Sequence, residues 1–569
     1  MFALDTEGST PQVMKKVSRN SSNSCFRSSQ LPRLIFFAAM IYGLLSFTGM
    51  GGYVTRNVST KSVRALTWNM AAINNNPFEY WITNTDPKYN ALMAGVSDFI
   101  KNPNDKDVTV GEVFTDEMFA ELETLMRAAN WKYVDETKAK WNSEFKNRHI
   151  ISQFIKDDLL GKKRLVSMPD RVTNTLSDAN GADVLRPTVI NCYAKDLSDS
   201  KVWWGHWKNF MFVDPVQLSL DKPAAVVGSM LAPIKKSKYP AIETDEEMMS
   251  IPLQTLNLAI FDAILVHMLN TVSPDWNSIR DTICTKLNRK KTDRTIEILT
   301  TTYKDYDMQF LQEVGSAFIK SASKNEHVLS LFDVHVPIKL DTKRDQNSVI
   351  LLGKNKYQSV TEVTDKVIAL YNSKNADSKL PVADGDLFAI TVEKLDSTDN
   401  QLRNYGKYLL ASFHGDTNGL ATKAVVTAVQ DYASQQLPDH KLLFGMDANT
   451  YAHPEKDQQG VTDFAQWYSE RHLNTCYGPS PNPLNFTTFH ARTYLQPQLN
   501  KAITFEEKDV KGDKNPKDFI LFFKSDFNVV ETRKDNTGKR TYIDGMVFPT
   551  LDFPSDHGVT STLLEENSR

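Results

Sequence analysis

The sequence is poor in cysteine. Its 569 residues include four, Cys25, Cys192, Cys284 and Cys476, and no two of them have the Cys-x-x-Cys spacing. Four scattered cysteines indicate neither a disulfide framework of the kind that holds small secreted folds together nor a thiolate zinc site. The sequence is compatible with one disulfide bond.

An excess of charge of one sign is also lacking, because the formal net charge is only −3. Such a chain has no general attraction for polyanions, so a nucleic-acid partner is not favoured, although a local basic groove would be invisible in this sum. A chain of 569 residues exceeds what one hydrophobic core usually absorbs. We therefore expect either one large domain with an insertion or two domains.

A long apolar run lies near the N-terminus. Residues 1–33 are rich in Ser and Asn and carry five basic residues, a composition that predicts a disordered tail. Residues 34–54 then contain no charged residue over 21 positions, enough to cross a hydrocarbon layer of about 30 Å. We predict an uncleaved signal anchor, that is, a transmembrane helix. A cleaved signal peptide is the alternative, but the tail before the run is long for one.

The predicted anchor bears on localisation. Five Lys/Arg precede it and three follow between 56 and 64, which favours a cytoplasmic N-terminus and a lumenal or extracellular main body. The Asn-x-Ser/Thr triplets at 57–59 and 485–487 agree with a glycoprotein on that side. We expect a single-pass membrane protein held in the lipid bilayer by residues 34–54, or a secreted protein if that segment is cleaved.

Residues 77–289 lie between the first and second predicted strands. Their apolar residues recur mainly at helical spacing, and the stretch 249–272 is apolar enough to suggest a second membrane span. Asp262 and His267 lie inside that stretch, and a central Asp costs roughly 2.5–3.5 kcal/mol in a membrane, so we predict a buried soluble helix. The aromatic run 203–207 has three interpretations: it stacks on a base or sugar, it lies at a membrane interface, or it packs the insertion against the main body. We favour packing.

Polar side chains lie at the ends of most predicted strands. Alternating or apolar stretches predict strands at 62–70, 306–314, 347–352, 387–392, 408–413, 440–444, 517–523 and 559–564. The polar residues at their ends are Asn69, Glu313, His414, Asp447, Asn449, Asp518, Asp556 and His557. A carboxylate at the end of an apolar strand must be solvated, paired or bound to a metal, and an Asp-His pair can orient and protonate. The pattern indicates a hydrolytic site.

In this order, the strand ends resemble the motifs of the endonuclease/exonuclease/phosphatase superfamily, which includes DNase I-like nucleases, inositol-polyphosphate 5-phosphatases and neutral sphingomyelinases. The matching stretches are Trp68-Asn69, Leu311-Gln312-Glu313, Phe413-His414, Asp447-Ala448-Asn449, Asp518-Phe519-Ile520 and Ser555-Asp556-His557. Two features depart from the family: Met446 separates Gly445 from Asp447, and the first two motifs are far apart in the sequence.

The resemblance implies an α/β fold, a four-layer sandwich of two mixed β-sheets flanked by helices. Residues 62–76 and 290–569 would form this domain. Residues 77–289 would be a large, mainly helical insertion after the first strand, and the N-terminal transmembrane helix would precede the whole.

The resemblance also implies a role for each site residue. Glu313 would be the principal Mg²⁺ ligand, with Asn69 beside it and Asp556 completing the oxygen shell; Mn²⁺ is the alternative ion. Asp447 would orient or deprotonate the attacking water, and Asn449 would hold a phosphoryl oxygen.

The remaining predicted residues act on the phosphate. His557 would stabilise the transition state, with its charge supported by Asp518. His414 would bind the phosphate or protonate the leaving oxygen, and Asn418 would be a further substrate contact.

The function has three interpretations, two of which differ in the substrate. The first is a phospholipid head group, inositol phosphate or small phosphoester, cleaved by a membrane-anchored phosphodiesterase or phosphatase. The alternative is DNA or RNA, cleaved by a secreted or membrane-tethered nuclease with a basic stripe at 235–238 and 289–291. The third is a non-catalytic binding module on the same fold.

Overall fold

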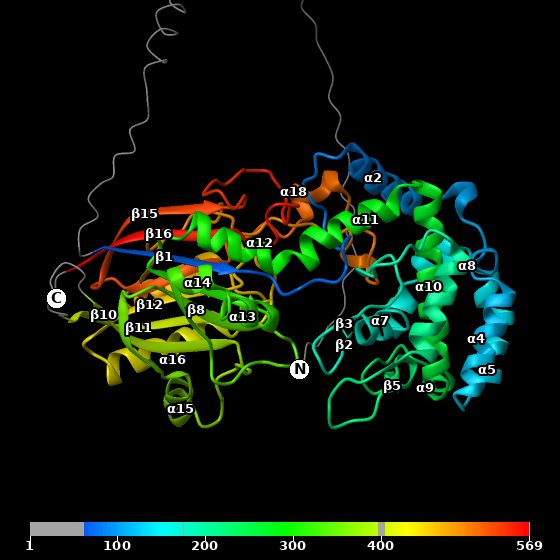
Figure 1. The fold of residues 1–569 in the computed structure, drawn as a ribbon, viewed down its shortest axis with the longest axis horizontal. Coiled ribbons are helices and arrows are strands. Elements are labelled where there is room, and N and C mark those ends of the chain that lie inside the picture. Colours follow the sequence, from blue (N-terminus) through cyan, green and yellow to red (C-terminus); the bar gives the residue numbers. More distant parts are fainter. Residues whose placement is uncertain (1–61, 175, 396–403, 568–569) are drawn as a thin grey trace, which may run out of the picture. The chain divides into compact units, whose positions relative to one another are not determined.

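Two six-stranded mixed β-sheets lie face to face (Figure 1). The computed structural model describes residues 62–174, 176–395 and 404–567, so the predicted anchor at 34–54 and the triplet at 57–59 lie outside the described residues. The first sheet has the order β15-β16-β1-β6-β8-β7: β15 (Phe527–Asp535), β16 (Val559–Glu566), β1 (Ser62–Asn69), β6 (Met308–Val314), β8 (Asn347–Gly353) and β7 (Phe332–His335). The second has the order β13-β14-β12-β11-β10-β9: β13 (Leu473–Thr475), β14 (Asp518–Phe523), β12 (His440–Asp447), β11 (Asn404–His414), β10 (Leu387–Leu395) and β9 (Tyr357–Glu362).

The strand register brings the polar strand ends to one edge of each sheet. In the first sheet β1 runs parallel to β6, with Asn69 opposite Gln312. In the second sheet β11 runs parallel to β12, with His414 opposite Asp447, and Asp447 in turn lies opposite Asp518 of antiparallel β14. The polar residues are therefore neighbours within each sheet.

Helices cover the outer faces of both sheets. Apolar side chains from the inner faces, such as Phe310 and Leu443, fill the space between the sheets. The first sheet packs against α12 (Lys291–Glu297), α13 (Ser316–Ala322) and α14 (Glu326–Leu331), and the second against α15 (Thr364–Lys374), α16 (Thr422–Gln436) and α17 (Val461–Glu470). The predicted α/β sandwich of two mixed sheets flanked by helices is confirmed.

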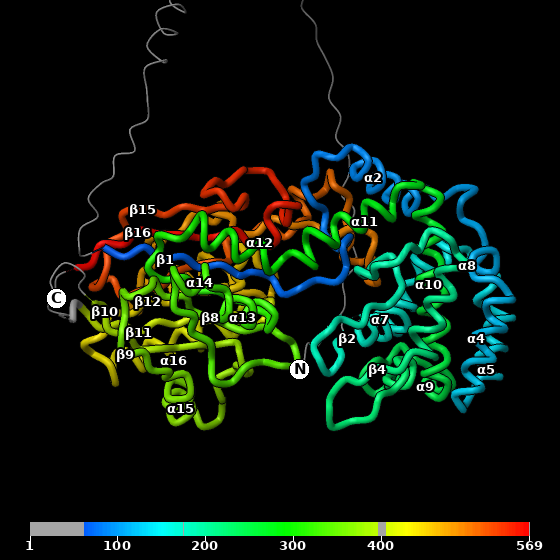
Figure 2. The backbone as a smooth tube through the Cα atoms, in the orientation of Figure 1, coloured from blue at the N-terminus to red at the C-terminus, as the bar shows by residue number. Residues whose placement is uncertain are grey.

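The segment between β1 and α12 is mainly helical, as predicted. Its chain, blue to green in Figure 2, leaves the end of β1 and returns through α11 and α12. Its helices are α2 (Pro87–Lys101), α3 (Val110–Val113), α4 (Asp116–Ala128), α5 (Val134–Ser143), α6 (Asp158–Lys163), α7 (Ser167–Thr173), α8 (Ser200–Lys208), α9 (Thr244–Met248), α10 (Ser250–Val272) and α11 (Trp276–Cys284). It also has two pairs of two-residue strands: β2 (Leu176–Ser177) pairs with β3 (Asp183–Val184), and β4 (Pro215–Val216) pairs with β5 (Ala225–Val226). Short π-helical turns, among them Thr285–Arg289, continue several of these helices. The short helix α18 (Lys508–Lys511) belongs to the loop before β14.

Helix α10 is the centre of the insertion. Within the described part of the chain it is the one helix long and apolar enough to cross a membrane, and 78% of its most apolar window is buried inside the protein. Its Asp262 is fully buried and pairs with the equally buried Arg186 at 3.1 Å, while Thr188 donates to it at 2.6 Å. These bonds stabilise a buried carboxylate. The expected burial of this helix inside the protein is confirmed.

The aromatic run 203–207 forms part of α8, and its three tryptophans are buried. Trp204 stacks on Trp207 and meets Phe114 edge-on, and Trp207 Nε1 donates to Asp262 Oδ2 at 2.9 Å. Packing is thus the correct interpretation. Its location differs from the prediction, because these partners belong to the core of the insertion and not to its contact with the sheets.

Candidate active site

Asn69, Glu313 and Asp447 meet at the carboxyl ends of β1, β6 and β12. Asn69 Nδ2 donates to Glu313 Oε1 at 3.0 Å and to Asp447 Oδ2 at 2.9 Å, so one amide bridges carboxylates from both sheets. The register of β6 shifts at a bulge, where Glu313 has a φ of 51°. A bulge redirects a side chain, and this one is fixed by Ala72 N, which donates to Glu313 Oε2 at 3.0 Å.

His557 lies beside this cluster, on the turn before β16. Trp68 Nε1 donates to the His557 carbonyl at 3.0 Å and holds the turn against β1. His557 Nδ1 is 3.0 Å from Asp518 Oδ2, and Nε2 is 3.6 Å from Asp447 Oδ2. Burial disfavours the charged imidazolium, but Asp518 and Asp447 outweigh it and raise the pKa of His557 to about 10. His557 is thus a cationic donor at neutral pH.

His414 and Asn449 flank the two carboxylates. His414 Nε2 is 3.3 Å from Glu313 Oε1 and 3.7 Å from Asp447 Oδ2. Asn449 has a φ of 47°, and its backbone N–H donates to Asp447 Oδ1 at 2.9 Å, a local turn that asparagine and aspartate favour. Both carboxylate oxygens of Asp447 are thus held in place.

A cavity of about 1060 Å³ lies over the cluster. Its wall includes six of the predicted residues: Glu313, His414, Asp447, Asn449, Asp556 and His557. Asn69 and Asp518 are fully buried behind that wall. Asn418 lies in the adjoining loop, where its backbone N–H donates to Asp416 Oδ1 at 3.1 Å and its carbonyl accepts from Gln459 N at 2.9 Å. Asn418 is not part of the cavity wall.

Asp556 occupies a separate corner of the cavity. Its Oδ2 is 3.5 Å from His490 Nε2, and it is absent from the carboxylate cluster of Glu313 and Asp447. Burial alone would raise the pKa of Asp556, but His490 and His557 outweigh burial and lower it. Tyr80 meets His490 edge-on, with ring centroids 4.8 Å apart. This corner was not predicted, because His490 and Tyr80 lie in irregular segments that carry no strand or motif signal.

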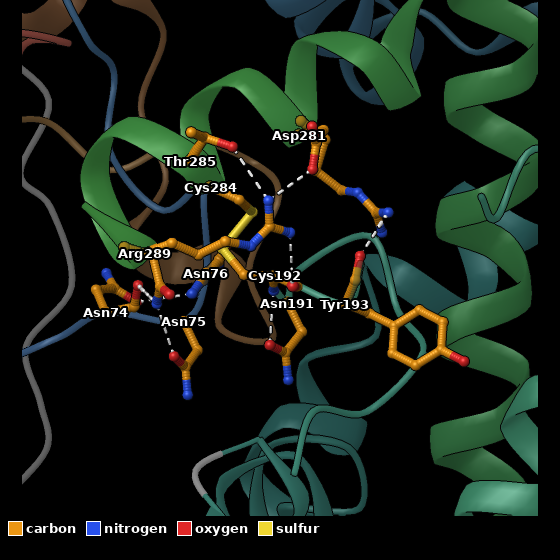
Figure 3. The surroundings of a disulfide bond; sticks show 12 residues. Asn74, Asn75, Asn76, Asn191, Cys192, Tyr193, Asp281, Cys284, Thr285 and Arg289 are labelled. Atoms are coloured by element: carbon orange, nitrogen blue, oxygen red, sulfur yellow. Dashed lines mark hydrogen bonds and ion pairs between the residues drawn. A yellow bond between two sulfur atoms is a disulfide. The ribbon is translucent and has the colours of Figure 1, made fainter. Parts of the chain in front are cut away.

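The single disulfide that the sequence leaves open is present on the cavity wall. Cys192 is bonded to Cys284 at the end of α11, and both line the cavity. Arg289 donates to Asp281 Oδ1 at 2.8 Å, to Thr285 Oγ1 at 3.1 Å and to the Cys192 carbonyl at 3.3 Å (Figure 3). The disulfide and this guanidinium together fasten the Cys192 loop to the returning helix.

Asparagines join the insertion to the loop after β1, which lies beside the disulfide in Figure 3. Asn288 Nδ2 donates to the Asn74 carbonyl at 3.2 Å and to Asn75 Oδ1 at 2.8 Å, and Asn75 Nδ2 donates to the Asn174 carbonyl at 2.9 Å. These amides bind one another, so they form a structural joint in the cavity wall.

The residues present fit a divalent metal ion. The ligand atoms of Glu313, His414 and Asp447 lie within 4.8 Å of one another. Glu313 Oε1 and Asp447 Oδ2 both lie close to Asn69 Nδ2 and His414 Nε2. The negative charge of the two carboxylates is therefore concentrated at one place. Carboxylate oxygens are the ligands that hard cations prefer.

Comparison with known protein families gives a match over part of the chain. A family model described as "Domain of unknown function (DUF8234)" matches residues 107–281, most of the insertion. No curated protein sequence matches the chain.

The chain is similar in fold to several solved structures. Truncated Caenorhabditis elegans TDP2 is 14% identical over 49% of this chain and 92% of its own, with a TM-score of 0.30. The human Nocturnin catalytic domain with bound sulfate is 12% identical over 50% and 89%, with a TM-score of 0.31. An endonuclease/exonuclease/phosphatase from Beutenbergia cavernae is 13% identical over 49% and 66%, with a TM-score of 0.29.

Proposed function

We propose that this protein is a Mg²⁺-dependent phosphoester hydrolase, held in a membrane by residues 34–54. The observation that carries the proposal is the convergence of strand ends from two sheets on one cavity: Glu313 of the first sheet and Asp447 of the second are bridged by a single amide and flanked by His414 and His557. Anionic metal ligands beside a cationic donor, His557, suit the hydrolysis of a phosphoester.

The chain's own residues divide the work of an in-line displacement. A bound Mg²⁺ supplies neutralisation of phosphate charge. Asp447 accepts a proton from the attacking water, whose oxygen forms the new bond to phosphorus while the bond to the leaving oxygen breaks. His557, kept charged by Asp518, donates to a phosphoryl oxygen. His414 protonates the leaving oxygen, and Asn449 orients the phosphate.

A compact substrate is favoured over a nucleic acid. Residues of the insertion, including the disulfide, form part of the cavity wall. Two of the cavity's basic residues are already paired, since Arg344 lies 2.8 Å from Asp386 and Lys517 lies 2.9 Å from Asp513. These pairs leave less free positive charge for a polyanion. We therefore propose a phospholipid head group, an inositol phosphate or a small phosphoester.

A hydrolysis screen tests this function. Purified protein with Mg²⁺ is assayed on phospholipids, inositol phosphates, nucleotides, DNA and a generic phosphodiester, alongside Glu313→Ala and His557→Ala. We expect chelator-sensitive release of product from a small phosphoester by the wild type, and loss of release in both variants. Equal turnover in all three proteins would contradict the catalytic assignment, and turnover confined to DNA would favour a nuclease.

A further inference from the structure

Lys291 is a buried cation that the roles above do not use. It is the first residue of α12, directly after the insertion, and only 7% of its surface is exposed. It lines the same cavity as Glu313 and Asp556. In the sequence it belongs to the basic cluster 289–291, which the nuclease alternative would use as part of its basic stripe.

The ammonium of Lys291 has unused donor capacity. Among the described residues its Nζ donates one hydrogen bond, to the Ala72 carbonyl at 3.2 Å. An ammonium carries three N–H groups. Lys517, a cation equally buried in the cavity wall, has a carboxylate within 2.9 Å. An ion held out of water needs compensation by opposite charge and hydrogen bonds, so the position of Lys291 suits a group that arrives with the ligand.

Two carboxylates act on the charge of Lys291. Burial lowers the pKa of Lys291 to about 8, against the opposing effect of Asp556 and Glu313. Both carboxylates line the same cavity as Lys291. A divalent cation held by Glu313 would offset part of this negative charge, and Lys291 would then suit an anionic group of a ligand.

We propose that Lys291 binds an anionic oxygen of the substrate's phosphoryl group, so that α12, the helix directly after the insertion, supplies part of the phosphate site. This inference deepens the proposed function and rests on it. An ammonium is a compact point charge that binds phosphate without demanding a planar arrangement.

A purely structural role for Lys291 makes a different prediction. Through the Ala72 carbonyl it also touches the loop whose Ala72 N–H fixes Glu313. If Lys291 acted only through that contact, replacing Lys291 would shift the loop and lower kcat and thermal stability. Affinity for phosphate would not depend on the charge at this position.

Phosphate binding by Lys291→Met separates the two roles. Binding of inorganic phosphate is measured by calorimetry in the presence of Mg²⁺, and kcat and KM are measured on the generic phosphodiester. The control is Lys290→Met, an exposed lysine one position earlier. We expect about 10- to 100-fold weaker phosphate binding in Lys291→Met, partial recovery in Lys291→Arg and no change in the control.

Each outcome decides the inference separately from the hydrolase proposal. Phosphate affinity equal to wild type in Lys291→Met, or absent from the wild type, would overturn the role of Lys291 whatever the turnover. Phosphate binding that depends on Lys291 in a protein without turnover would refute the hydrolase proposal but keep the anion site. If Lys291→Met does not fold, Lys291→Gln, which keeps a donor for the Ala72 carbonyl, replaces it in the same assay.

Discussion

Replacing Asp518 by asparagine removes a buried negative charge beside His557 and leaves the shape of the side chain unchanged. The Asp518 Oδ2 to His557 Nδ1 distance is 3.0 Å, and Asp518 is fully buried. At an effective dielectric constant of about 20, two charges at this separation attract by about 5 kcal/mol. Because burial costs both groups part of their hydration, we assign roughly 2–4 kcal/mol to the net effect.

The lost attraction between Asp518 and His557 should slow the chemical step. The asparagine can still accept the hydrogen bond from Nδ1, so His557 keeps its orientation but loses the support for its positive charge. A barrier higher by that amount lowers kcat about 30- to 1000-fold. KM should change little, because the cation acts on charge that develops in the transition state.

Steady-state kinetics on a generic phosphodiester with saturating Mg²⁺ provide the measurement. The matched control is Asp526→Asn, the same substitution at a fully buried carboxylate just beyond the opposite end of β14. A kcat within threefold of wild type in Asp518→Asn would refute the reasoning, as would an equal loss in both variants, since that loss would reflect general destabilisation.

Three further predictions concern the metal, the insertion core and the disulfide. Glu313→Gln should fold but lose at least 100-fold in turnover and lose the rise in melting temperature that Mg²⁺ gives the wild type; an unchanged Mg²⁺ response would contradict its role as ligand. Asp262→Ala should destabilise the protein by about 3–5 kcal/mol in urea unfolding, because it removes one of the two carboxylates that pair with buried Arg186, Asp170 being the other, and the acceptor of buried Thr188 and Trp207. Exposed Asp281→Ala should cost about 1 kcal/mol or less. Replacing Cys192 and Cys284 by serine removes a cross-link over 92 positions and should cost about 2–4 kcal/mol, with a reductant destabilising only the wild type.

The central strands could be predicted from the sequence, whereas the edge strands could not. Apolar or alternating runs predicted β1, β6, β8 and β12, which lie inside their sheets. Strands β7, β9, β13 and β15 lie at the edges. An edge strand pairs on one side and packs less, so its sequence carries a weaker pattern; β9, for example, has exposed residues at three successive positions.

The candidate site was predictable where a side chain follows a strong strand. Asn69, Glu313 and Asp447 end such strands, and the fold brings them within hydrogen-bonding distance. His490 could not be found in this way. It lies in the irregular segment between β13 and β14, and its place beside Asp556 results from that segment's path across the cavity.

The position of Lys291 follows from the topology of the first sheet. Because β1 and β6 are parallel neighbours, the chain that leaves the carboxyl end of β1 must return to the amino end of β6 through a crossover. That crossover ends with α12 and the turn after it, so α12 must begin near the carboxyl ends of the strands, where the site lies. Asn69 and Glu313 are 244 positions apart, yet this requirement does not depend on what is inserted between them. Any residue at the start of that helix would lie beside the site, and in this chain the residue is a lysine.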